Sequence, residues 1–163
     1  MARQGRYGRM SRGSTIVEFA IALLVFVTLL VAIIEFGWLF FIQHTLQYAT
    51  REGTRLALVG RTVNDPSGNP MTRVDSIIRT IRDASSLAVR PDAVLISIYP
   101  VSASFGDPAN WENIQDAGEP GDYMRVRTRF VHTFFTPLIG GFFPDGRITL
   151  QAEGTYRNEL FDE

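Results

Sequence analysis

The sequence contains no cysteine and no lysine, and its only histidines are His44 and His132. The missing cysteines exclude a disulfide framework and a bacterial lipoprotein anchor, but they leave the redox compartment undecided. The two histidines lie on separate stretches, and the sequence has neither a phosphate-binding glycine loop nor a GxSxG nucleophile elbow. We therefore predict that the protein is not an enzyme, with no catalytic residues, cofactor, metal or small-molecule substrate.

Acidic residues outnumber basic residues after the first twelve positions of the chain. Four of the sixteen basic residues, Arg3, Arg6, Arg9 and Arg12, form a leader without a single acid. The remaining residues carry twelve arginines against seventeen acids, a formal charge of -5, whereas the whole chain has a formal charge of -1. Nucleic-acid-binding proteins typically need a strongly basic surface. The distribution predicts that nucleic acid is not a partner.

A long apolar run follows the leader. From Phe19 to Ile42 the only charged residue is Glu35. A helix of this length spans about 36 Å, which exceeds the hydrocarbon core of roughly 30 Å. Bulky aromatic residues follow the run where a secretory signal would have a small-residue cleavage site. We expect a membrane span with its basic N-terminus in the cytoplasm and the residues after about Gln43 outside.

The helix is expected to continue beyond the membrane. Residues 43–60 contain no proline, and small or apolar residues recur along one side at three- and four-residue steps. They are Ile42, Leu46, Ala49, Gly53, Leu56 and Ala57. We predict one helix of roughly 45 residues, about 70 Å long, that ends near Gly60. Ala49 and Gly53 keep this side thin, so it suits helix packing; we favour packing on the chain's own sheet over packing on a partner.

Glu18 stands at the start of the apolar run, where a carboxylate costs about 2.5 to 3.5 kcal/mol on membrane-insertion scales. An ammonium about 4 Å away would return about 4 kcal/mol at an effective dielectric constant of 20. No lysine can supply it, but a cut after Gly13 would create an α-amino group on Ser14, one helical turn from Glu18. The alternative is an uncleaved signal anchor in which Glu18 reaches water at the interface.

These residues carry a family resemblance. Gly13, four further residues and then Glu18 and Phe19, placed between an arginine-rich leader and a long apolar helix, resemble the class III prepilin signature of type IV pilins and pseudopilins. More narrowly, residues 12–60 resemble the TadE-like proteins of tight-adherence (Flp-type) pilus systems, whose first helix has an internal EFG and a later REG. In this chain EFG and REG occupy residues 35–37 and 51–53.

The resemblance implies a minor pilin or pseudopilin of the bacterial inner membrane that a prepilin peptidase cuts between Gly13 and Ser14. It assigns Glu18 and Phe19 to processing or subunit registration. The implied partners are the peptidase, other pilin-like subunits and the pilus assembly machinery of an adhesion system. The alternative is an uncleaved single-pass scaffold whose outer domain binds pilus-assembly or envelope partners.

Glu35 is a second acid within the apolar run, seventeen residues after Glu18 and roughly 100° around the helix from it. The residues leave three states open, because Glu35 can be hydrated, protonated or paired with a partner helix. A single span cannot form an ion pathway alone. We therefore expect Glu35 to act in helix association and assembly.

The remainder of the chain is predicted to form one α+β domain outside the cytoplasm. A turn-rich linker at residues 61–70 precedes a helix that Asn69 caps, with Pro70 in its first turn and an apolar stripe reaching about Ala84. Alternating apolar and polar residues predict three strands, at 93–101, 123–133 and 147–157. We expect an antiparallel meander covered by helix on one face, although the connections are long enough for crossovers.

With 163 residues, the chain is long enough for one modest domain and a tether. The predicted divisions are a leader at 1–13, a transmembrane helix at 14–42, its extramembrane continuation at 43–60 and the outer domain at 61–163.

A row of arginines, Arg125, Arg127 and Arg129, alternates along the middle predicted strand. Glu153 on a neighbouring strand can satisfy part of the row through cross-strand pairs worth about 0.2 to 1 kcal/mol each. We favour a solvated sheet face for this row, and the alternative is contact with the acids of another subunit.

Two long loops complete the domain. Residues 102–122 include five acids and no base, but their spacing matches no EF-hand, so we expect an ordinary soluble loop and not a calcium site. Residues 134–146 are apolar, resemble the TPL stretch of TadE-like proteins and are too short to span a bilayer. This second loop either wraps the sheet edge, which we favour, or offers an exposed patch to the membrane surface or to a partner.

Overall fold

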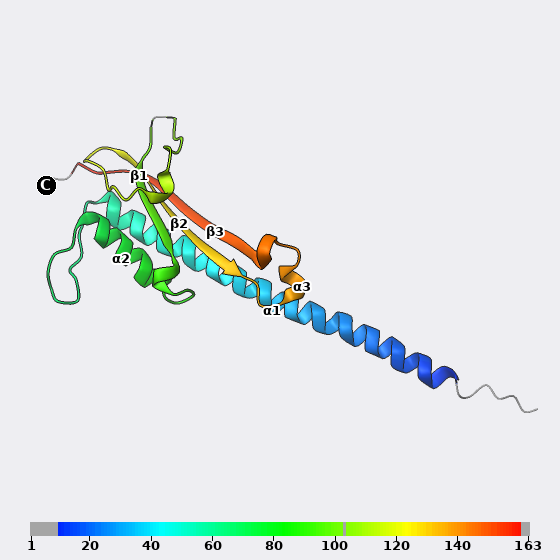
Figure 1. Cartoon of the computed structure of the whole chain (residues 1–163). Helices are drawn as coiled ribbons and strands as arrows, with labels where there is room; N and C mark the ends of the chain where they lie inside the picture. Colours follow the sequence, from blue (N-terminus) through cyan, green and yellow to red (C-terminus); the bar gives the residue numbers. More distant parts are fainter. Residues whose placement is uncertain (1–9, 103, 161–163) are drawn as a thin grey trace, which may run out of the picture. The chain divides into compact units, whose positions relative to one another are not determined.

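The structure, a computed structural model, describes residues 10–102 and 104–160, with side chains from Gly13 onward (Figure 1). It divides into two compact units, of which the first ends at Trp38 and the second begins at Leu39. The leader arginines Arg3, Arg6 and Arg9 lie outside the described residues, as does the side chain of Arg12.

The first unit consists of the N-terminal part of helix α1, which spans Met10–Leu58. Large apolar side chains are exposed along it, among them Phe19, Leu24 and Ile34. Within the described residues this is the one helix long and apolar enough to cross a membrane, and none of its most apolar stretch is buried. These are the properties of a single membrane span.

The second unit contains the last twenty residues of α1, Leu39–Leu58. The helix ends near Gly60, as predicted. Gly60 has a φ of +65°, and its N–H donates to the carbonyl of Ala57 at 3.1 Å. A left-handed residue just past the last helical turn satisfies a carbonyl that the helix leaves without a partner, and glycine adopts this conformation without a steric penalty.

Helix α2, Arg73–Ser85, begins later than predicted because Thr72, and not Asn69, caps it. The Thr72 hydroxyl oxygen accepts from the Asp75 N–H at 3.1 Å. Asn69 instead belongs to the preceding turn, where its N–H donates to the Asp65 carboxylate at 2.8 Å. Since the capping hydroxyl must lie next to the first free N–H groups, Thr72 satisfies this requirement and Asn69 does not.

The sheet has the predicted antiparallel order. Strands β1 (Leu95–Pro100), β2 (Tyr123–Thr133) and β3 (Arg147–Arg157) pair in the order β1-β2-β3. Both pairs are antiparallel, so the chain forms a meander without a crossover. The predicted α+β fold, with a long N-terminal helix, a second helix and a three-stranded antiparallel sheet, is confirmed.

The second-unit part of α1 packs along the apolar face of the sheet (Figure 1). Thr50 and Thr128 of β2 share a buried hydrogen bond of 2.7 Å between their hydroxyls. On β3, Gly154 has no side chain, and a Cβ there would lie 2.5 Å from the Thr54 hydroxyl. The close approach of helix and sheet therefore depends on a small residue on β3. The core includes Leu46, Ala49, Ile77, Ile81, Ile98, Met124 and Val126.

Contacts along this helix fix its direction relative to β3. The Gln43 side-chain amide donates to the carbonyl of Gln151 at 2.9 Å, and the N–H of Glu159 donates to the carbonyl of Leu58 at 2.9 Å. As the helix advances from Gln43 to Leu58, β3 therefore advances in the same direction beside it. The start of β3 and the end of β2 lie at the Leu39 end of this segment.

Candidate functional site

The predicted processing residues lie in the first turns of α1, where Ser14 and Glu18 share one face. Gly13 and Ser14 are both helical and exposed, and the Ser14 hydroxyl donates to the Glu18 carboxylate at 2.7 Å. Glu18 and Phe19 are also exposed, with 67% of Phe19 accessible. The spacing of four residues thus places Ser14 in direct contact with Glu18, as helical geometry requires.

This contact determines what a cut before Ser14 would do chemically. The new ammonium would belong to the residue that already contacts Glu18. Its charge would lie close to the carboxylate without any rearrangement of the helix beyond the cut. An exposed acid at the start of an apolar helix would then gain a cation of the same chain.

Gly13 has no packing role among the described residues. A Cβ built on it would meet nothing within 4 Å, and its φ is not in the left-handed region. The fold therefore gives no reason for glycine at this position. A requirement for glycine here would have to come from a molecule that binds this segment.

A comparison with protein families gives a match over part of the chain. Residues 13–55 match the family model described as TadE-like protein. Over this segment, the chain is similar to TadE-like proteins. A search of curated proteins found no match, and a search of solved structures found none. The matched segment starts at Gly13 and includes Glu18, Glu35, Ala49 and Gly53.

The second acid of the apolar helix has a different environment from the first. Glu18 is exposed, whereas only 2% of Glu35 is accessible. The predicted role of Glu35 in helix association and assembly stays a prediction.

The side of this helix that carries Ala49 and Gly53 packs against other parts of the same chain. Ala49 is fully buried. Gly53 faces α2 so closely that a Cβ there would collide with the side chain of Ile81 and lie 3.6 Å from Ile77. The predicted packing side therefore contacts α2 at Gly53, where packing on the sheet was expected.

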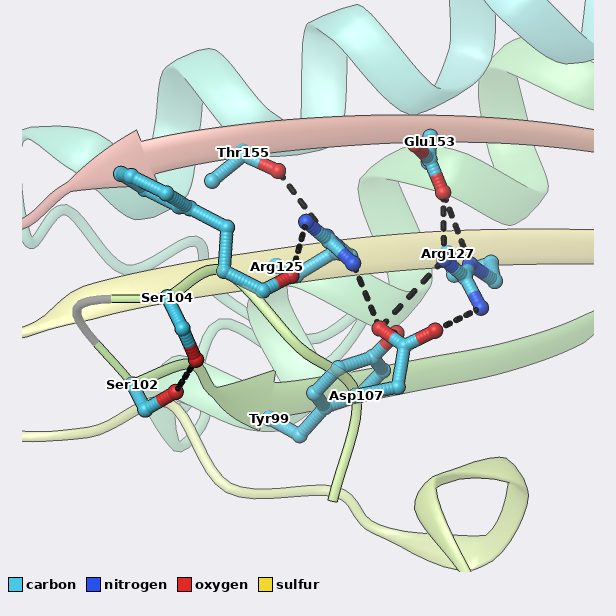
Figure 2. A network of polar contacts seen from close by, with 9 residues as sticks. Tyr99, Ser102, Ser104, Asp107, Arg125, Arg127, Glu153 and Thr155 are labelled. Carbon is cyan, nitrogen blue, oxygen red and sulfur yellow. Dashed lines mark hydrogen bonds and ion pairs between the residues drawn. The ribbon is translucent and has the colours of Figure 1, made fainter.

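The arginine row lies on the opposite face of the sheet and forms an ion-pair network (Figure 2). Arg127 faces Glu153 across the β2–β3 register and donates to its carboxylate, with an Nε to oxygen distance of 2.9 Å. It also donates to Asp107 at 2.8 Å, and Arg125 donates to the same carboxylate. Two arginines thus share one acid from the 102–122 loop.

Aromatic side chains complete this network and cover it. The Tyr99 hydroxyl donates to Asp107 at 2.8 Å. The Trp111 ring lies 4.3 Å from the guanidinium carbon of Arg127 and 4.7 Å from that of Arg129, within cation–π range. The loop therefore folds back over the arginine face.

The prediction of a solvated arginine face is wrong. The side chains of Arg125, Arg127 and Arg129 are only 11%, 9% and 19% exposed. The predicted partner Glu153 is confirmed, but Asp107 was missed. A cluster of acids without a base was the available signal that this loop has a basic partner. Contact of the row with another subunit stays a prediction.

Asp107 is held ionised by its donors. Partial desolvation raises its pKa, but the hydrogen bonds from Tyr99, Arg127 and Arg125 together outweigh desolvation and hold the pKa of the carboxyl below its usual range. Burial, and then the hydrogen bond to Asp107, raise the pKa of the Tyr99 hydroxyl to about 12. The pair therefore exists as phenol and carboxylate at neutral pH.

The lowered pKa of Asp107 predicts acid sensitivity. Because the folded pKa lies below the unfolded value, this carboxylate stabilises the fold above about pH 4, and its contribution is lost as pH falls through the folded pKa. Asp107→Asn should lower the free energy of unfolding by about 1 kcal/mol at pH 7, discounted for partial exposure. Denaturant unfolding of the full chain in detergent at pH 7 and pH 3 measures this. Parallel losses at both pH values would contradict it.

Proposed function

We propose that this protein is a minor pilin, a pseudopilin-like subunit of a tight-adherence type IV pilus, with a structural and not a catalytic role. A prepilin peptidase would cut it between Gly13 and Ser14. The observation that carries the proposal is the match of residues 13–55 to the TadE-like family model, on a helix that brings Ser14 into contact with Glu18. Its α1 would then join the corresponding helices of other pilin-like subunits.

The proposed location is the bacterial inner membrane. The arginine-rich leader supports a cytoplasmic N-terminus through the positive-inside bias. The exposed apolar part of α1 supplies the span, and the α+β domain would lie outside the cytoplasm. This orientation places the Gly13–Ser14 bond near the cytoplasmic surface, where an intramembrane peptidase would reach it.

Glu18 would act twice in this scheme. During assembly its carboxylate would attract the new terminus of Ser14, either in its own chain or in a neighbouring subunit. A neighbour's terminus would align two helices at one register, because the pairing energy falls with distance. This role predicts that loss of the Glu18 charge impairs incorporation and not insertion.

The second candidate is an uncleaved membrane scaffold whose outer domain binds pilus-assembly or envelope partners. One observation favours it, since α1 begins at Met10 and the Gly13–Ser14 bond is already helical. A helical segment must unwind before a peptidase can cut it. An uncleaved protein would keep the continuous helix.

The intact mass of the membrane-extracted protein separates the two candidates. In cells with an active prepilin peptidase we expect a product that begins at Ser14, and in Gly13→Ala we expect the full-length chain. Gly13→Ala is a clean variant because a Cβ at this position meets nothing within 4 Å. A full-length wild-type chain in peptidase-competent cells would contradict the minor-pilin proposal.

Glu18→Gln tests the role of the Glu18 charge in assembly. It keeps a side chain that can accept from Ser14 and removes only the charge, so membrane insertion should be unaffected or easier. The amount of the variant in purified filaments should fall relative to its amount in the membrane. Equal filament incorporation of wild type and Glu18→Gln would remove the role assigned to this carboxylate.

A further inference from the structure

The β2–β3 connection, residues 134–146, is an ordered loop with an inner and an outer side. On the inner side, Phe134 stacks on Phe143 with ring centroids 4.3 Å apart, and Ile139 is 7% exposed. The Phe134 N–H donates to the carbonyl of Gly146 at 3.0 Å, which closes the base of the loop. These contacts determine which of the remaining side chains point outward.

The outer side is apolar and exposed. Leu138 and Phe142 are 59% and 81% accessible, and Phe135 is 70% accessible. Helix α3, Pro137–Gly140, holds Leu138 outward while its neighbour Ile139 is buried. The only charged residue of the loop is Asp145. An exposed aromatic and aliphatic cluster of this kind marks an interaction surface.

The position of the loop in the second unit is the basis for choosing a partner. Thr128 of β2 contacts Thr50 of α1. From Thr128 to Thr133 the strand advances about 16 Å at about 3.3 Å per residue. From Thr50 back to Leu39 the helix covers about 16 Å at 1.5 Å per residue. The base of the loop is therefore level with Leu39.

Leu39 is also the residue at which the chain enters this unit. The predicted transmembrane segment, residues 14–42, includes the residues directly before Leu39 and ends just after it. Covalent connectivity alone thus keeps the Leu39 end of the unit beside the bilayer. The opposite end of the sheet, where Glu159 contacts Leu58, lies about 30 Å further along the helix.

We propose that the outer side of this loop, through Leu138 and Phe142, inserts into the interfacial region of the lipid bilayer. Aromatic and aliphatic side chains at this depth lose contact with water while the backbone remains hydrated. Arg147, exposed at the base of the loop, suits a lipid phosphate. The domain would then have two membrane contacts, the span and the loop, which together restrict how it turns about its tether.

The absence of cysteine from the sequence makes the test direct. Phe142→Cys and Leu138→Cys, made separately in the full chain, would each carry a single environment-sensitive fluorophore. The labelled proteins are reconstituted at one chain per nanodisc of phosphatidylcholine and phosphatidylglycerol. Quenching is measured with phosphatidylcholine spin-labelled near its headgroup and with aqueous iodide. We expect a blue-shifted emission that the spin-labelled lipid quenches and iodide does not.

Leu160→Cys is the matched control. Leu160 is 89% exposed and follows Glu159 at the Leu58 end, so its label should respond to iodide and not to the lipid quencher. Phe142 and Leu138 labels that respond like the Leu160 label would overturn the proposal. Lipid-insensitive labels whose iodide protection appears only with several chains per disc would overturn it as well, because they would show a second copy as the occupant.

The quenching result depends neither on misfolding of the variants nor on the proposed pilin function. Both loop residues are exposed, so the cysteine variants should melt at the parent temperature. The measurement needs no peptidase, filament or pilus machinery. Its failure would leave the minor-pilin proposal untouched, and an uncleaved scaffold could still show loop insertion.

Discussion

Replacing Arg127 with leucine is expected to lower the free energy of unfolding by about 2 to 3 kcal/mol. The change leaves Asp107 and Glu153 without their shared donor on a largely covered sheet face. Truncating one member of a fully buried pair costs about 3 to 5 kcal/mol, and partial exposure of both acids reduces that value. Denaturant unfolding of the full chain at pH 7 measures the loss.

Two variants control this experiment. Arg129→Leu removes an arginine from the same strand and face, but its ion pair with Glu112 is long, at 3.9 Å, so we expect a loss of about 1 kcal/mol or less. Arg127→Lys keeps the charge but has one nitrogen where arginine reaches Glu153 and Asp107 with different nitrogens, so its loss should be intermediate. Equal losses in Arg127→Leu and Arg129→Leu would show that the two-acid pairing contributes little.

Replacing Gly53 with leucine should destabilise the protein by about 3 kcal/mol, the upper end of the usual cost of overpacking. Even the first added carbon would collide with Ile81, which is fully buried and β-branched and therefore has little freedom to move. Gly53→Ala should cost less, because the better helix propensity of alanine returns about 1 kcal/mol.

Gly37→Leu is the matched control on the same helix. A Cβ at Gly37 meets nothing within 4 Å, so leucine there should leave the free energy of unfolding unchanged or raise it. Thermal and denaturant unfolding in detergent compare the variants. A Gly53→Leu protein as stable as Gly37→Leu would mean that α1 and α2 do not approach as closely as described.

Local patterns were enough to predict most of the elements. The alternation in β2 and β3 gave both strands their observed bounds, 123–133 and 147–157. The first strand begins at Leu95 and not at Ala93, because Pro91–Ala93 form a short 3-10 turn. Apolar periodicity does not distinguish the last residues of a turn from the first residues of a strand.

The helix cap required a choice between two local signals. Asn69 followed by Pro70 and Thr72 followed by Asp75 are both acceptable starts. In the fold, Asp65 binds both the N–H and the side-chain amide of Asn69, so this asparagine is committed to the turn. The competing turn could not be ranked from the sequence without its geometry.

The proximity of Ser14 to Glu18 was predictable because the two residues lie four positions apart on one helix. The network around Asp107 was not, since it depends on how a loop of some twenty residues returns to the sheet. The sequence contains the arginine row and the acidic loop, but it does not specify which acid reaches which arginine. Cross-strand pairing predicted Glu153 because sheet register alone determines that contact.

The segment Leu39–Leu58 has a mechanical consequence. The same residues that continue the membrane helix also form one wall of the domain core, with Leu39, Ile42 and Leu46 buried. A pulling force applied to the domain through Leu39 acts along the helix. It is therefore distributed over the contacts between helix and sheet, such as Thr50 with Thr128, which must break together. A soluble fragment designed to begin after the apolar run would lose the buried Leu39 and Ile42 from this wall, so the recombinant domain must start no later than Leu39.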